Sequence, residues 1–370
     1  MASKAKQYNN IKLAFGIGKG ITTFVIVLLF VWLGVSEWLQ SYVAHYTENS
    51  YLQLLLFVVA AGLATSVIFF PVNYYLGFYL EHKYELSNQT FFAWIGENLK
   101  GALVGGVIGL PILMLFYYVL TTFGVWWWLP FAVLMFIISV VLAQIMPVLI
   151  LPLFYKVTPI DDEDIKERIL RLSKAVGMKI ENVYQFNMSK NTKKANAAFT
   201  GLGKTKRVIL GDTLLADYTS DEIETVLAHE FGHYKHNHIA KNIFIGTAFS
   251  FLTFFLMAQL YSLSLGWFGF ASITTIAALP LLMLWGMLIG LVQTPISNYI
   301  SRYFEYQADT YAIEQTNKPE AFINTLEKLT NQNLGDREPH PLVEWFSYSH
   351  PSINKRVSFI KSLSPSGNDL

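Results

Sequence analysis

Six long apolar stretches constrain this chain more than any other feature of its sequence. They lie at residues 21–39, 52–80, 102–120, 126–154, 243–263 and 270–292, and each is long enough for a helix to cross a bilayer. Only 14% of the residues are charged, whereas a soluble domain averages about 25%. The lysine-rich start resembles a signal peptide, but no small-residue cleavage site follows it, so we interpret the first stretch as a retained span. We expect a mainly α-helical polytopic membrane protein with about six transmembrane helices.

The apolar stretches divide the chain into four parts. Residues 1–154 form an N-terminal membrane domain with four spans, and residues 155–242, which are rich in charge, form the first half of a polar domain. Residues 243–295 hold two further spans, and residues 296–370 complete the polar domain. Helical periodicity over 161–176, a short strand at 183–188 and a hairpin of 195–200 with 207–210 predict a small α+β fold in the first half.

Lysine and arginine gather in the two terminal segments, in the connection 81–100 and in residues 155–242, whereas the three alternate loops hold almost none. The positive-inside rule therefore predicts that both termini and the polar domain lie in the cytoplasm. Compact loops and the absence of a retention signal favour a bacterial inner membrane over an endoplasmic reticulum. A net charge of +1 gives no reason to expect a nucleic-acid partner, and the lack of cysteine excludes disulfides and thiolate metal ligands.

The polar domain contains the motif HEFGH at residues 229–233, on a predicted helix that begins with a capping-box pattern of Thr219 and Glu222. On a helix, His229 and His233 lie one turn apart on one face, so their imidazoles can bind one metal ion. Glu230 lies beside them, in the general-base position of H-E-x-x-H metalloproteases. The alternative is a pair of solvated histidines next to an acid, which the motif favours less.

A catalytic zinc site needs a third protein ligand and leaves its fourth position for water. His236 and His238 are near in sequence, but a continuous helix would place His236 about 10 Å from His229, so neither suits the role. Glu305 and Asp309 lie one turn apart on a helix predicted over residues 298–309. One carboxylate can bind the metal while the other orients a ligand histidine, and an acidic surface patch is the alternative.

Together these motifs resemble those of the type I CAAX prenyl protease family, integral-membrane zinc metallopeptidases of the gluzincin group. Four separated stretches carry the resemblance, in the family's order and with two spans between the metal-binding motifs. They are NAAFTG at 196–201 with RVILGDTLL at 207–215, HEFGH at 229–233, SRYFEYQAD at 301–309, and HPSINKR at 350–356. Weaker similarity extends over most of the remaining chain.

The resemblance implies a complete set of site residues and one zinc ion per chain. They are the metal ligands His229, His233 and Glu305, the catalytic residues Glu230, His350 and Arg356, the supporting Asp309, and the substrate-binding residues Asn196 and Ala197. His350 and Arg356 would face the zinc, and Asn196 would lie on an edge strand that receives the substrate as an added strand. A capping histidine at 350 and an ordinary hairpin asparagine at 196 are the alternatives. Family members usually enclose a chamber between seven helices, whereas this chain has six spans.

The expected fold therefore joins the membrane helices to a zincin-like α+β metalloprotease domain with a small β-hairpin or sheet. The expected function is hydrolysis of peptide bonds near the cytoplasmic membrane surface, and the resemblance implies removal of C-terminal tripeptides from prenylated proteins. One alternative is a quality-control metalloprotease of the heat-shock type, which degrades membrane proteins. Another is a non-catalytic membrane metal transporter or scaffold that recruits His236 and His238. The spans hold few ionisable groups of the kind an ion path needs, which speaks against it.

Overall fold

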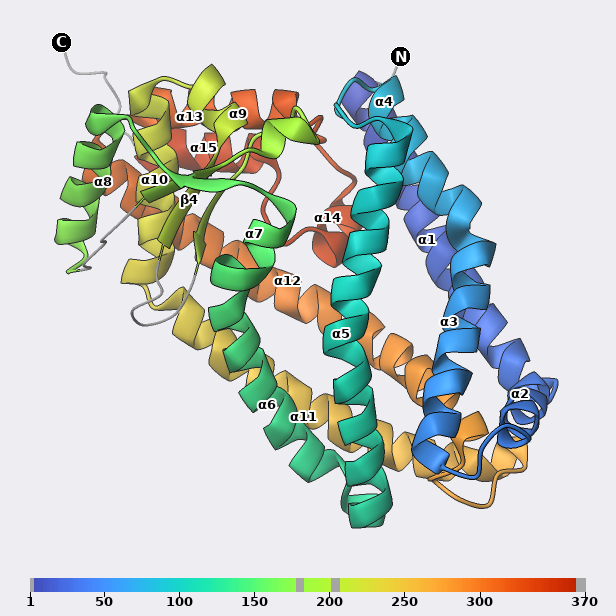
Figure 1. Cartoon of the computed structure of the whole chain (residues 1–370). Coiled ribbons are helices and arrows are strands. Elements are labelled where there is room, and N and C mark those ends of the chain that lie inside the picture. The colour runs from blue at the N-terminus through green and yellow to red at the C-terminus, as the bar shows by residue number, and fades with distance from the viewer. Residues whose placement is uncertain (1–2, 178–182, 201–206, 364–370) are drawn as a thin grey trace, which may run out of the picture.

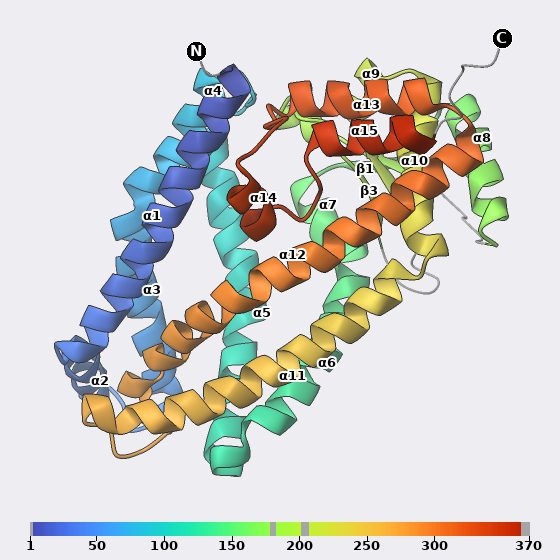
Figure 2. The same ribbon diagram turned by 180° about the vertical axis from the view of Figure 1, so that it is seen from behind.

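The computed structural model describes residues 3–177, 183–200 and 207–363. Within these ranges six helices are long and apolar enough to cross a membrane, so the predicted number of spans is confirmed. Figures 1 and 2 show α12 running diagonally from the neighbourhood of α1 to the polar domain. The main segments of the six spans are α1 (Lys4–Trp32), α3 (Ser50–Tyr74), α5 (Phe91–Phe123), α6 (Trp128–Ile145), α11 (His238–Ser264) and α12 (Pro280–Thr316).

The first span differs from its predicted bounds. α1 begins at Lys4, where the Ser3 side chain accepts a hydrogen bond from the backbone N–H of Lys6 at 3.2 Å. The lysine-bearing start therefore continues the helix instead of preceding it. The predicted run to residue 39 is broken at Gly34, whose φ of 72° ends the helix, and the short α2 (Val35–Ala44) follows. A hydropathy pattern does not reveal a helix break that a single glycine makes.

The sixth span begins later and continues further than predicted. α12 starts at Pro280 instead of near residue 270, since proline suits the first turn of a helix. A 3₁₀ turn, Ile276–Ala278, precedes it. The helix then continues to Thr316, so Glu305 and Asp309 lie on the same helix as the span. Two other spans are lengthened by π-helical turns, Tyr75–Tyr79 and Met146–Ile150, and by α4 (Leu80–Lys83) and α7 (Leu151–Phe154).

A four-stranded sheet of order β1-β2-β4-β3 lies in the polar domain. Its strands are β1 (Val157–Pro159), β2 (Val183–Phe186), β3 (Ala197–Thr200) and β4 (Arg207–Gly211). β2 and β4 are parallel, whereas β1 pairs antiparallel with β2 and β3 antiparallel with β4. The pairing of β3 with β4 confirms the predicted hairpin, and residues 201–206, which join the two strands, lie outside the described residues. β3 forms one edge of the sheet.

Two large hydrophobic cores of the described residues hold the molecule together, and α12 contributes to both, while a smaller third cluster joins Tyr8 of α1 to Leu80 of α4. The membrane core surrounds Trp127 and Tyr261 and includes Leu281 of α12, whereas the core of the polar domain surrounds Phe231 and includes Ala312 of α12. The other helices of the polar domain are α8 (Glu163–Ala175), α9 (Asp212–Asp217), α10 (Ser220–Lys235), α13 (Pro319–Gln332), α14 (Pro341–Ser347) and α15 (Ile353–Leu363). Because α12 packs into both cores, it fixes the position of the polar domain relative to the membrane helices.

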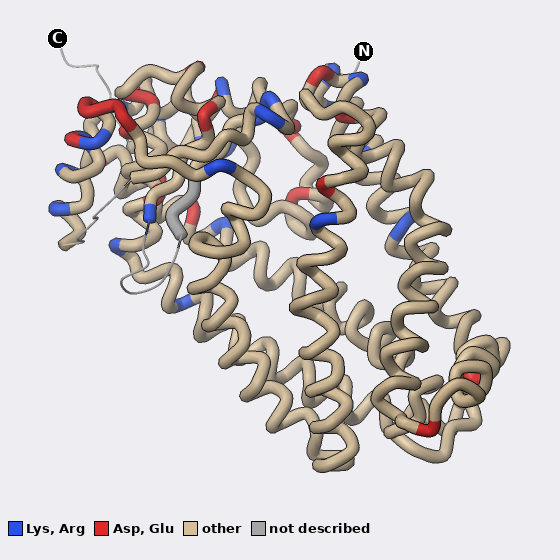
Figure 3. Tube along the Cα trace, in the orientation of Figure 1, with Lys and Arg blue, Asp and Glu red and all other residues tan. Residues whose placement is uncertain are grey.

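Charged residues gather at one end of the molecule (Figure 3). The blue lysine and arginine positions lie over the polar domain and the adjoining ends of the spans, and both ends of the described chain lie there as well. An even number of spans, here six, places both ends of the chain on the same side of the membrane, which agrees with this arrangement.

Candidate metal centre

The position of α10 is fixed at its start by a capping box and near its end by a close helix contact. Thr219 Oγ1 accepts a hydrogen bond from the backbone of Glu222 at 3.3 Å, and Glu222 Oε2 accepts one from the backbone of Thr219 at 2.9 Å. Gly232 packs so closely on α12 that a Cβ there would lie 2.9 Å from the Cα of Ala308. This approach brings the histidine face of α10 against the carboxylates of α12.

Three side chains from these two helices converge with the spacing of metal ligands. Nε2 of His229 lies 3.2 Å from Nε2 of His233 and 3.3 Å from Oε2 of Glu305, whereas Nε2 of His233 lies 3.3 Å from the other oxygen, Oε1. Ligand atoms about 2.0–2.1 Å from a tetrahedral zinc ion are about 3.3–3.4 Å apart, so each of these three spacings suits two ligands of one ion. Glu305 is 4% exposed, and its Oε2 accepts no hydrogen bond from the described residues. A buried carboxylate oxygen without a donor fits a cation ligand.

Asp309 and Arg356 orient one of the two histidines. Nδ1 of His229 lies 2.9 Å from Oδ1 of Asp309, a fully buried residue one turn beyond Glu305 on α12. Arg356 of α15 donates from Nε and Nη2 to the two oxygens of Asp309, at 2.9 and 2.5 Å. Because Asp309 accepts the Nδ1 proton, the lone pair on Nε2 of His229 points to the metal position.

The charges around His229 control its protonation. Burial on its own would lower the pKa of His229, but the nearby carboxylates of Asp309 and Glu305 raise it to about 9. A metal ion therefore competes with a proton for this imidazole. Burial also opposes the charge of Arg356, yet Asp309 raises the pKa of its guanidinium above the usual value. Arg356 thus remains a cation inside the site.

His238 occupies a position that the sequence argument missed. α10 ends at Lys235, Asn237 adopts a left-handed conformation with φ 55°, and α11 begins at His238. The helix therefore reaches its cap at His236 and does not continue into His238. Asparagine tolerates the left-handed conformation better than most residues, so Asn237 was the available signal for a helix end.

The break brings His238 back onto His233. Nδ1 of His238 lies 2.9 Å from Nδ1 of His233, and its Nε2 lies 2.8 Å from Oε1 of Gln307. Since the amide oxygen accepts, Nε2 of His238 donates and its Nδ1 accepts the proton of His233. Nε2 of His233 is then free for the metal. The ring of His238 is also stacked on Phe304, with centroids 4.1 Å apart, which holds it in this orientation.

A cavity of about 320 Å³ opens beside the three candidate metal ligands. Of the predicted site residues, its walls include His229, Glu230, Glu305, His350, Arg356, Asn196 and Ala197, and do not include His233 or Asp309. The edge strand β3 thus faces the same space as the motif glutamate. His350 lies at the mouth, with its side chain 62% exposed and its Nε2 3.4 Å from Oε1 of Glu305. It also lines a larger cavity, of about 830 Å³, beside the first turns of α1.

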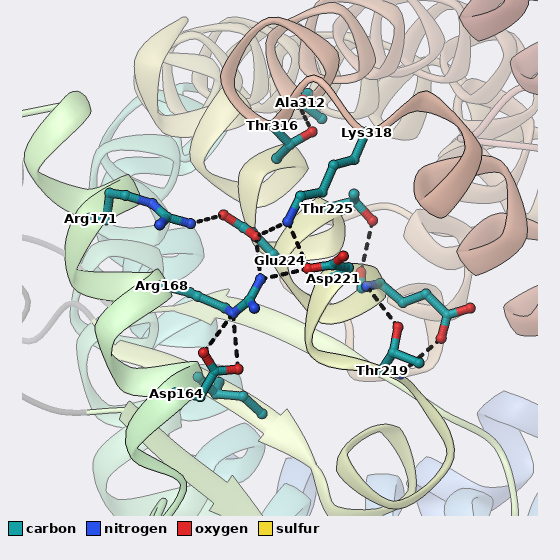
Figure 4. A network of polar contacts seen from close by, with 12 residues as sticks. Asp164, Arg168, Arg171, Thr219, Asp221, Glu224, Thr225, Ala312, Thr316 and Lys318 are labelled. Atoms are coloured by element: carbon teal, nitrogen blue, oxygen red, sulfur yellow. Dashed lines mark hydrogen bonds and ion pairs between the residues drawn. The ribbon is translucent and has the colours of Figure 1, made fainter.

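A network of charged side chains fixes the first half of α10 to its neighbours (Figure 4). The buried Glu224 accepts hydrogen bonds from Arg168 of α8 at 2.6 Å and from Lys318 at 2.8 Å, and it also pairs with Arg171. Asp221 lies 2.7 Å from both Arg168 and Lys318. Burial on its own would raise the pKa of Glu224, but Lys318, Arg171 and Arg168 hold it below its usual value. The network therefore joins α8, α10 and the turn after α12.

The structure combines bilayer-crossing helices with two histidines and a glutamate that could hold a metal ion, and an open sheet edge faces the same cavity. These features together indicate the class of integral-membrane metalloproteases. The comparisons with known proteins agree with this class. Residues 159–364 match the model of peptidase family M48, and residues 2–156 match that of the CAAX prenyl protease N-terminal region, described as five membrane helices. The chain therefore belongs to peptidase family M48. In the described part of 2–156 the structure has four long apolar helices and the ten-residue α2.

The similarity to known proteins extends over most of the chain. The uncharacterized metalloprotease YhfN of Bacillus subtilis is 32% identical over 95% of this chain and 84% of its own length. CAAX prenyl protease 1 of Saccharomyces cerevisiae is 31% identical over 84% of this chain and 73% of its own. The crystal structure of S. mikatae Ste24p matches with a TM-score of 0.86 at 29% identity, covering 96% of this chain and 88% of that one. The predicted family, fold class and metalloprotease activity are thus confirmed.

Proposed function

We propose that the metal of this protease is zinc, one ion per chain, bound by His229, His233 and Glu305. The observation that supports this most strongly is the spacing of the donor atoms: the two Nε2 atoms lie 3.2 Å apart, and each lies 3.3 Å from a different oxygen of Glu305. One of these oxygens, Oε2, receives no hydrogen bond from the described residues. When bound, zinc supplies a Lewis acid that activates a water and polarises the peptide carbonyl. Asp309 and His238 hold the two histidines in the tautomer that the ion requires.

Glu230 acts as the general base. It lies next to His229 at the wall of the cavity, where its carboxylate can take the proton that the water loses on attacking the carbonyl carbon. The same carboxyl then gives the proton to the amine nitrogen as the C–N bond breaks. His350, exposed at the cavity mouth, can donate an N–H to the oxyanion, a contribution of about 3 kcal/mol in other acyl-transfer enzymes.

Arg356 and the edge strand have supporting roles in this proposal. Because Arg356 is buried and engaged by Asp309, it positions that carboxylate and His229 instead of contacting the substrate. Asn196 and Ala197 lie where an extended peptide can add to β3, with backbone hydrogen bonds setting its register. The peptide would then cross the cavity in front of Glu230.

We infer that the substrate is the C-terminal segment of a prenylated protein, since several relatives are named CAAX prenyl proteases. The apolar spans beside the site give a lipid chain a place to remain while the peptide is cut. We further infer that the peptidase domain, residues 155–242 with 296–370, lies on the cytoplasmic side of a bacterial inner membrane. The gathering of lysine and arginine at that end supports this orientation. Reporters fused at the two termini should both indicate the cytoplasm, and a periplasmic N-terminus would contradict it.

The decisive experiment compares the parent with Glu230→Gln on a farnesylated peptide and on the same peptide without the lipid. The variant keeps the size of the side chain but cannot accept a proton, so cleavage should fall by about 100-fold or more while zinc stays near one per chain. Glu48→Gln, the same change in the exposed loop between α2 and α3, is the matched control and should cleave at the parental rate.

Parental cleavage by Glu230→Gln would contradict the role of Glu230 as base. Loss of zinc from that variant would contradict the assignment of the ligands. Equal cleavage of the two peptides by the parent would contradict the prenylated substrate, yet would leave the peptidase assignment intact.

A further inference from the structure

The open edge of β3 ends at a side chain from another part of the chain. Gly211 of β4 donates its N–H to the carbonyl oxygen of Asn196 at 2.9 Å, so the backbone of Asn196 faces β4. Backbone groups of successive strand residues point to alternate sides, so those of Ala195 and Ala197 face the open edge. An added peptide strand would use these outward groups.

Asn333 already occupies the outward groups of Ala195. Its Oδ1 accepts a hydrogen bond from the backbone N–H of Ala195 at 3.0 Å, and its Nδ2 donates to the carbonyl oxygen of Ala195 at 3.2 Å. These are the two bonds that a paired strand residue would make. The edge is therefore closed at Ala195, and Ala197 is the first residue from that end whose outward groups face the cavity.

The position of Asn333 is fixed from two sides. It caps α13, with its own N–H bonded to the carbonyl oxygen of Leu329 at 3.0 Å. The next residue, Leu334, has a positive φ of 50°, and its carbonyl oxygen accepts a hydrogen bond from Nδ2 of Asn9 in α1 at 2.6 Å. A membrane helix therefore holds the turn that carries Asn333, and the two hydrogen bonds to Ala195 hold the side chain against β3.

We propose that Asn333 is a specificity-determining residue: it sets the register of the peptide on β3 and limits how many residues the peptide extends on that side of the scissile bond. This inference rests on the proposed function, in which β3 receives the substrate. Ala195 and Ala197 are about 7 Å apart along the strand, so a peptide paired with Ala197 meets Asn333 within about two residues. Asn333 lines the same cavity of about 320 Å³ as Glu230, so the limit lies near the reacting bond.

The experiment uses the zinc-loaded full chain and a series of peptides that share one core sequence. The peptides are lengthened residue by residue, first on one side of the scissile bond and then on the other. Mass spectrometry gives the bonds that are cut, and initial rates give kcat/KM for each length. The ratio of kcat/KM for the short and the long peptide does not depend on the fraction of folded protein, so partial misfolding of a variant cannot imitate the effect.

The parent should cleave peptides extended on one side at least about 10-fold less efficiently than short ones, as a blocked subsite requires. Asn333→Ala should reduce this ratio to about 3-fold or less and should add neighbouring cleavage positions. Gln332→Ala is the matched control, because the hydrogen bonds of this neighbouring residue join it to other groups: the carbonyl of Lys193, the carboxylate of Asp217 and the hydroxyl of Tyr218. It should keep the parental ratio and cleavage position.

Two results would overturn the register role. A parent that cleaves long and short peptides equally has no length limit, and an Asn333→Ala variant that keeps the parental ratio places the limit elsewhere. A zinc-loaded parent that cleaves no peptide at all would instead contradict the proposed function, and the inference with it.

Discussion

Gly232 is the residue whose enlargement tests most directly how the metal site is assembled. A Cβ at this position would lie 2.9 Å from the Cα of Ala308 and 3.1 Å from both the carbonyl oxygen of Ala308 and the Cβ of Tyr311. Carbon atoms pack best about 3.5–4.0 Å apart, so Gly232→Ala must separate α10 and α12 by about 0.6–1 Å. Two of the three close atoms belong to the backbone, which cannot turn aside as a flexible side chain could.

The separation should weaken metal binding more than it weakens the fold. His229 and His233 lie on α10 and Glu305 lies on α12, and ligand distances tolerate deviations of only about 0.2 Å. We expect zinc affinity to fall by at least about 10-fold, the loss typical of a disturbed ligand orientation. The free energy of unfolding should fall by only about 0–2 kcal/mol. Overpacking destabilises the fold by about 1–3 kcal/mol, whereas alanine is about 1 kcal/mol more favourable in a helix than the glycine it replaces.

The assay is competition for zinc against a chromophoric chelator, with peptide cleavage and thermal unfolding measured on the same samples. Gly246→Ala in α11 is the matched control, since no atom lies within 4 Å of a Cβ built there, and it should keep the parental affinity. If Gly232→Ala binds zinc within about twofold of the parent, the close helix contact does not set the ligand spacing and the reasoning is wrong.

Three further changes test the surroundings of the site. Asp309→Asn should lower zinc affinity by about 10–100-fold in the same chelator assay, because the amide no longer fixes the Nδ1 proton of His229; unchanged affinity would contradict that role. His238→Phe preserves the stacking on Phe304 but not the hydrogen bond to Nδ1 of His233, so zinc affinity should fall by about 10-fold, and parental affinity would show that His238 only fills space. Glu224→Gln should lower the free energy of unfolding by about 1–2 kcal/mol at neutral pH, since partly exposed cations surround a buried carboxylate. The pKa of Glu224 is lowered in the fold, so its stabilisation is complete above its unfolded pKa of about 4.3 and is lost as the pH falls through the lower folded value; thermal unfolding across pH 2–7 should show the parent and the variant converging only at the acid end.

The sequence by itself determined the features that depend only on residues close to one another along the chain. The spans follow from runs of apolar residues, because a bilayer demands about 20 of them in a helix whatever lies nearby. The start of α10 follows from the capping box of Thr219 and Glu222, and the facing of His229 and His233 follows from helical geometry. The pairing of β3 with β4 could likewise be predicted, since two short β-rich runs flank a glycine-rich link.

Tertiary structure alone decided how these local pieces meet. No periodicity relates Gly232 to Ala308, yet their close packing brings a carboxylate of α12 to the two histidines. The reversal at Asn237 carries His238 back onto His233, and the cap of α13 brings Asn333 to an edge strand 138 residues earlier in the chain. Such contacts depend on the relative placement of rigid helices around two cores. A local sequence pattern specifies the conformation of one segment, whereas that placement is fixed only when all the segments pack together.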